Sequence, residues 1–160
     1  MTVTSADGLI GRGAGELARL VRGGEVSARE LVDAHVRRIE EVNPRLNAVV
    51  VPLFEQAREA AAAGDEARTR GAPLGPLHGV PVTIKEQLRV TGTPTSLGLR
   101  GQAGWRASDE GPLVTRLRRA GAIILGKTNV SQTLIFHEAD NPEEAFRRSP
   151  DYPANPPVGS

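Results

Sequence analysis

The chain has 160 residues, a length typical of one domain, and its 20 basic and 19 acidic residues leave a formal net charge of +1. With so small a net charge the chain has no excess of basic side chains to neutralise phosphates, which argues against a nucleic-acid partner. The absence of cysteine excludes disulfides and thiolate chemistry, and the three histidines lack metal-ligand spacing, so we expect no metal site and no cofactor. No stretch reaches the roughly 18 apolar residues that cross a membrane, and the polar N-terminus lacks a signal-peptide pattern. We therefore expect a cytoplasmic protein.

The first part of the chain predicts a leader followed by two helices. Residues 1–13 are polar and glycine-rich, which predicts a flexible segment, and a short helix is expected over 14–22. Ser27 and Glu30 have the spacing of a capping box, so a longer helix begins there. The Asn-Pro pair at 43–44 predicts its end, because a residue before proline is driven out of the helical conformation.

The middle of the chain alternates between strand and helix patterns. Short strands are expected over 47–51 and 79–84, with a surface helix over 54–70 between them and a long loop over 87–107 after them.

The next helix is expected to begin with Ser108 as its cap and to run to Ala120, and Gly121 follows in the left-handed conformation that ends a helix. Its buried face is predicted from the apolar spacing of Leu113, Val114 and Leu117. A buried strand over 122–125 follows, and residues 128–131 are expected to begin a further helix.

This alternation predicts an α/β fold with a largely parallel sheet. The chain has only two lysines, and Lys85 and Lys127 each follow one of the predicted strands. In open α/β sheets ligands bind at the carboxyl ends of the strands, so both amines are placed where a site is expected. The alternative for each is an ordinary solvated lysine at a strand end. Glu86 is expected to be a structural hydrogen-bond acceptor, because adjacent side chains of an extended segment point to opposite faces.

The last residues have a different composition. Five prolines follow position 141, and large apolar residues are scarce there. Such a segment buries too little surface to offset its ordering entropy, so we expect the tail over 143–160 to be disordered.

Two blocks resemble the amidase signature family of serine hydrolases. They are Gly-Pro-Leu-His-Gly-Val-Pro-Val-Thr-Ile-Lys-Glu over 75–86 and Ala-Gly-Ala-Ile-Ile-Leu-Gly-Lys-Thr-Asn over 120–129. Their separation is also similar to that in the family. Within the family, the residues at 85–86, 96–98, 128–132 and 140–142 are most similar to the fatty acid amide hydrolase branch.

The resemblance implies that residues 14–142 are the N-terminal portion of an amidase domain, with a mixed, largely parallel sheet covered by helices. It implies hydrolysis of carboxylic amides by a triad of nucleophilic serine, middle serine held by a cis peptide, and lysine. Lys85 matches the family lysine and would be the base, because a serine hydroxyl is a poor nucleophile until a neighbour takes its proton. Leu134 and Ile135 fall where the family lines the acyl side of its pocket, and the alternative for both is packing in the core.

The end of the chain departs from the family pattern. Ser160 falls at or beside the middle serine, but the glycine-rich surroundings expected there are missing and no nucleophilic serine follows. We therefore expect a truncated hydrolase that is inactive by itself, although its intact relatives act on small-molecule amides. One alternative is a non-catalytic fragment, or the half of a split enzyme that binds a complementary C-terminal half. Another is a fragment similar to the A subunit of a glutamyl- or aspartyl-tRNA amidotransferase.

Overall fold

The computed structural model describes residues 8–135. In chain order the helices and strands are α1 (Ala14–Gly23), α2 (Ala28–Leu46), β1 (Val49–Pro52), α3 (Phe54–Thr69), β2 (Pro81–Lys85), α4 (Pro112–Arg119) and β3 (Ile123–Thr128). Single 3-10 turns occupy Arg100–Gln102 and Gln132–Leu134. The predicted tail over 143–160 lies outside the described residues, as does the leader up to residue 7.

The three strands form one mixed sheet in the order β1-β3-β2. The central strand β3 is antiparallel to β1 and parallel to β2. An irregularity in the β2–β3 register follows Val82, which pairs with Ile124, so that Thr83 pairs with Gly126 and Ile84 with Lys127. The predicted α/β fold with a mixed sheet is confirmed.

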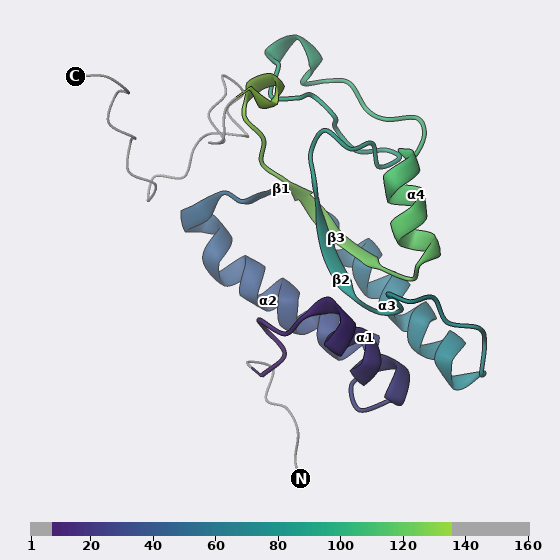
Figure 1. The fold of residues 1–160 in the computed structure, drawn as a ribbon. Helices are drawn as coiled ribbons and strands as arrows, with labels where there is room; N and C mark the ends of the chain where they lie inside the picture. Colours follow the sequence, from purple (N-terminus) through teal and green to yellow (C-terminus); the bar gives the residue numbers. More distant parts are fainter. Residues whose placement is uncertain (1–7, 136–160) are drawn as a thin grey trace.

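Helices cover both faces of this sheet (Figure 1). On one face α1, α2 and α3 bury an apolar core against β3, with Val21, Leu31 and Val32 fully buried and Ile123 and Leu125 beneath them. On the other face a smaller core gathers Ile84, Val114 and Ile124 with neighbouring apolar residues. Burying a side chain of this size contributes roughly 1.5–3 kcal/mol, so these two cores hold the strands in place.

The start of α2 is confirmed, but its end is not where the sequence predicts it. The Ser27 side chain accepts from the Glu30 amide at 3.0 Å, and the Glu30 carboxylate accepts from the Ser27 amide at 2.9 Å. The helix then continues through Pro44 to Leu46. Asn43 is held in its last turn because its side chain makes two hydrogen bonds with the backbone of Val49, which outweighs the preference of a residue before proline.

The start and the buried face of α4 also differ from prediction. The helix begins at Pro112 and its N-cap is Gly111, so Ser108 does not cap it. The preference of a residue before proline explains the later start of the helix. Gly111 precedes Pro112 and is extended, at φ −65° and ψ 148°, so the helix cannot include Gly111 or the residues before it. Val114 is fully buried, but Leu113 is 51% exposed and does not belong to the core.

The helix expected after β3 is, within the described residues, only the 3-10 turn Gln132–Leu134. Its residues Thr133 and Leu134 have positive φ angles of 53° and 63°, which interrupt regular helical geometry. Across residues 8–135, none of the helices has both the length and the apolar character needed to cross a membrane.

Candidate functional site

The carboxyl ends of β2 and β3 carry the two lysines, as the sequence predicts. Lys85 is the last residue of β2 and pairs with Thr128, whereas Lys127 pairs with Ile84 one position earlier. Because side chains alternate between the faces of a strand, the two lysines lie on opposite faces of the sheet. Lys85 is exposed, and Lys127 is fully buried. The two amines are therefore close along the strands but occupy different environments.

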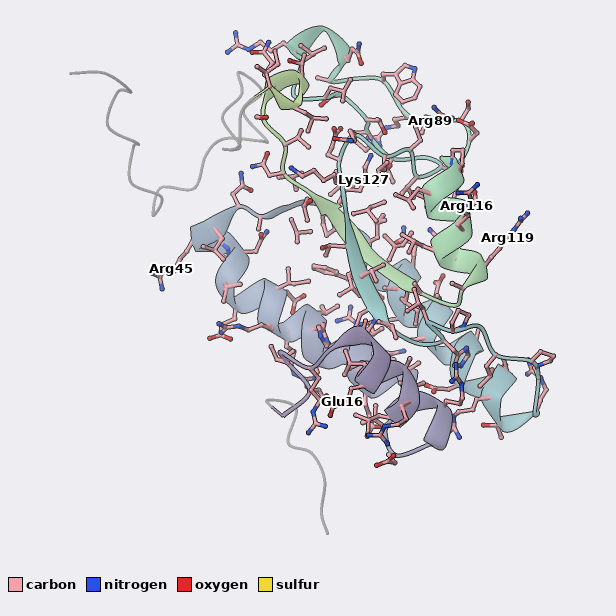
Figure 2. The ribbon with its side chains drawn as sticks, in the orientation of Figure 1. Glu16, Arg45, Arg89, Arg116, Arg119 and Lys127 are labelled. Carbon is pink, nitrogen blue, oxygen red and sulfur yellow. The ribbon has the colours of Figure 1, made fainter. Side chains whose placement is uncertain are left out.

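Lys127 reaches from β3 into the loop that follows β2, and Figure 2 labels its side chain there. The Nζ atom donates to Thr93 Oγ1 at 3.2 Å, to Thr95 Oγ1 at 2.9 Å and to the carbonyl oxygen of Pro94. Burial lowers the pKa of Lys127 from 10.5 to about 8, and the nearby Glu86 carboxylate opposes this change. An ammonium has three N–H donors, so these three oxygens satisfy it completely.

Glu86 begins the same loop and is also fully buried. Its Oε1 atom accepts from the Ser96 amide at 2.5 Å, and its Oε2 atom accepts from the Leu97 amide at 3.1 Å. The predicted structural role as an acceptor is confirmed. Amides donating to a carboxylate make charge-assisted bonds, which are about twice as strong as neutral ones. Glu86 therefore holds a defined part of the loop against the end of β2.

Backbone strain gathers where this loop meets the turn after β3. Among the described residues, four other than glycine have a positive φ: Asn47, Leu97, Thr133 and Leu134. Asn47 ends α2, and the other three come together here, because the Thr133 amide donates to the Leu97 carbonyl at 3.0 Å. Such conformations cost roughly 1–3 kcal/mol each and cluster at functional sites. The contact marks this end of the sheet as a candidate site.

The remaining predicted site residues lie in or beyond this region. Leu134 is half-buried and is the last residue of the turn that contacts Leu97, and Ile135, which follows this turn, is 72% exposed. Ser160 lies outside the described residues. Within residues 8–135 no cluster of three or more histidine or acidic side chains could hold a metal ion.

Sequence reasoning missed the partners of Lys127 and its burial. Thr93 and Thr95 are buried and polar, and they lie more than 30 residues before Lys127 in the chain. The available signal is Lys127 itself, which ends an otherwise apolar run and so predicts a buried, satisfied charge.

A cavity of about 370 Å³ lies beside the loop segment that Lys127 holds. Apolar residues of β1, α3 and β3 line it, and so do Thr93 and Pro94. Two arginines, Arg106 and Arg118, also line it, but Arg118 is paired with Glu110 at 2.9 Å. The bonds of Lys127 therefore fix one part of this cavity's lining.

The fold and the strand-end residues define an α/β protein that resembles the amidase signature enzymes. A family model described as Amidase matches residues 30–159. The chain is 42% identical over 135 residues to an indoleacetamide hydrolase of Bradyrhizobium diazoefficiens, covering 84% of this chain and 26% of that protein. It is 48% identical over 119 residues to the A subunit of a glutamyl-tRNA(Gln) amidotransferase of Salinispora arenicola, covering 74% and 24%.

Among solved structures, the native peptide amidase from Stenotrophomonas maltophilia superposes with a TM-score of 0.75 at 32% identity, covering 88% of this chain and 30% of that one. The chain belongs to the amidase signature family. It spans about a quarter of the length of the curated relatives that it matches.

Proposed function

We propose that this chain carries the proton-accepting lysine of an amide hydrolase and that Lys85 is this lysine. The observation that supports the proposal is the position of Lys85, in the family-like block over 75–86 and at the carboxyl end of β2. In the proposed reaction a serine oxygen attacks the amide carbon, and the serine proton passes through a middle serine to the Lys85 amine. The C–N bond breaks and the leaving amine takes that proton, and water then releases the acid from the acyl-serine.

The base must be neutral to accept a proton, and burial favours the neutral form of an amine. Within residues 8–135 the Lys85 side chain is exposed. The proposal therefore requires that segments outside these residues cover it. Since the chain spans about a quarter of its relatives' length, we expect the 160-residue polypeptide to be inactive when expressed by itself.

For the substrate we propose a carboxylic amide with an apolar acyl group, as in the fatty acid amide hydrolase branch. The residues at 85–86 and 128–132 support this branch. Leu134 and Ile135 are the apolar side chains proposed to contact the acyl group, and Ser160 is the proposed middle serine. We further propose that the protein acts in the cytoplasm.

The second candidate function is that of one half of a split enzyme, which assembles with a complementary C-terminal half. Among the described strands β2 pairs only with β3, so its other edge is open to a further strand. One relative is itself part of an amidotransferase, and an amidotransferase-like role is the remaining alternative. Under that alternative, glutamine would be the amide that is hydrolysed.

The test is complementation. The 160-residue chain is co-expressed with the part of the Stenotrophomonas maltophilia peptide amidase that follows the superposed segment. Hydrolysis of acyl p-nitroanilides with short and long acyl groups and of glutamine is then measured. We expect activity only in the mixture, with a preference for long acyl groups.

Lys85→Met should abolish this activity, whereas Arg116→Met, at an exposed position on α4 (Figure 2), should not change it. Activity that survives Lys85→Met would contradict the proposed base. Preference for glutamine would replace the acyl-amide substrate with the amidotransferase alternative. A soluble, assembled but inactive mixture would contradict the proposed function.

A further inference from the structure

Two fully buried charged side chains, Glu86 and Lys127, lie at the same end of the sheet. A buried charge is costly unless its hydrogen bonds are satisfied. Here both charges are satisfied by one short segment. Lys127 contacts Thr93, Pro94 and Thr95, and Glu86 contacts the next two residues. Five consecutive loop residues are therefore held by Lys127 of β3 and by Glu86, the residue that follows β2.

The loop segment in turn holds the chain that follows β3. The Leu97 carbonyl accepts from the Thr133 amide, and both of these residues have a positive φ. Strained backbone of this kind persists only where its surroundings fix it. Figure 1 shows the loop between β2 and α4 beside the turn that follows β3. The conformation of this turn therefore depends on where the loop is held.

We propose that Glu86 and Lys127 are positioning residues that act as one clamp. They fix the loop segment 93–97 onto the ends of β2 and β3. Through the hydrogen bond between Leu97 and Thr133 they also determine the backbone conformation of residues 131–135. Both side chains are fully buried, so they act through the loop and do not touch a substrate. The role of this turn in substrate binding rests on the proposed function, whereas the existence of the clamp does not.

The groups around Lys127 explain why a charge is needed. The loop offers it two hydroxyls and a carbonyl, β1 places Val51 in register with it, and β2 places Ile84 in register on the other side. Glu86 is the charged group that acts on it among the described residues. An apolar side chain at 127 would leave the hydroxyl oxygens of the buried residues Thr93 and Thr95, and the carbonyl oxygen of half-buried Pro94, without this donor. The loss costs roughly 1–3 kcal/mol for a buried group.

The clamp is tested by amide hydrogen exchange of the 160-residue chain, with Lys127→Met, Glu86→Gln and the double variant. Lys127→Met keeps most of the apolar stem, and Glu86→Gln keeps the shape of the carboxylate. Controls are Lys85→Met, at the exposed strand-end lysine, and Glu66→Gln, on α3 and paired with Arg70 at the surface.

The decisive amide is that of Thr133, which donates to the Leu97 carbonyl and not to either varied side chain. We expect each single variant to lower its protection at least about tenfold, and the double variant to lower it no further than the larger single effect. Amides of α2 should lose less protection than Thr133 in each variant, and the controls should leave Thr133 unchanged. Unchanged protection of Thr133 in the single variants, or two effects that multiply independently, would overturn the proposal.

A second measurement does not depend on the variants being folded. In the wild-type chain the methyl resonances of Thr93 and Thr95 are followed by NMR from about pH 6.5 to about pH 9.5, a range that brackets the lowered pKa of the amine, together with the ε-carbon resonances of the two lysines. Deprotonation leaves two N–H donors for three oxygens, so we expect both methyls to shift with the Lys127 amine. Methyls that stay constant while that amine titrates would overturn the clamp.

An activity measurement separates the clamp from the proposed function. In the complemented enzyme we expect Glu86→Gln and Lys127→Met to raise KM several-fold more than they lower kcat, whereas Lys85→Met removes kcat. A fall in kcat alone would contradict a positioning role for the clamp. An inactive mixture would contradict the proposed function, while the exchange and NMR results would still decide whether the clamp exists.

Discussion

Raising the pH from 8 to 10.5 tests the burial of the Lys127 ammonium directly. Burial lowers the pKa of this group from 10.5 to about 8 in the folded chain, whereas unfolding returns the amine to water. Between these two values the unfolded chain binds more protons than the folded chain, so the free energy of unfolding rises with pH. One pKa unit corresponds to about 1.4 kcal/mol, so the full rise is about 3 kcal/mol. The cost of the buried charge is fully present below pH 8 and is gone above pH 10.5.

The assay is urea denaturation followed by circular dichroism at about pH 7.5, 9 and 10.5, values that span the titration of the amine. Comparison with Lys127→Met isolates this amine from other groups that titrate in the same range, and that variant should lack the rise. Lys85→Met should keep it, because its lysine is exposed in the folded chain. The same pH dependence in the wild-type chain and in Lys127→Met would refute the buried charge.

Two further predictions concern the fold. Ser27→Ala removes the hydroxyl that accepts from the Glu30 amide, so it should lower the free energy of unfolding by about 1 kcal/mol in urea denaturation. Gly121→Ala should cost more than about 1–3 kcal/mol, because Gly121 has a φ of +89° and an added Cβ would lie 2.7 Å from the Cα of His78. Gly101→Ala, where nothing lies within 4 Å of such a Cβ and φ is not positive, is the matched control. Equal effects of the two glycine variants would show that the strain argument is wrong.

The parts of the fold that depend on local chemistry could be predicted from the sequence. The capping box at Ser27 and Glu30 acts within one helical turn, and the structure shows both of its bonds. The apolar run before Lys127 is a strand buried along nearly its whole length, as the pattern indicates. A residue before proline avoids the helical conformation, and the sequence predicts that this preference ends α2 before Pro44. In the structure α2 continues through Pro44, whereas the same preference fixes the start of α4 at Pro112.

Only those features of the candidate site that depend on the position of the strands could be predicted from the sequence. The sequence places Lys85 and Lys127 at the carboxyl ends of strands, and the parallel pairing of β2 and β3 confirms that placement. The apolar run before Lys127 indicates that this lysine is buried, but its partners Thr93 and Thr95 lie far away in the chain, so no local pattern could identify them. The acceptor role of Glu86 was predictable, but its two partner amides belong to the same irregular loop.

The role of Lys85 as the base stays a prediction, and chemical rescue tests it most directly. In the complemented enzyme, Lys85→Ala removes the amine and leaves space at the end of β2. Small alkylamines added to the solution should restore amide hydrolysis in proportion to their neutral form, and they should not accelerate the Arg116→Met control. An assembled Lys85→Ala enzyme that keeps its full rate, or that stays inactive at every amine concentration, would contradict Lys85 as the proton acceptor.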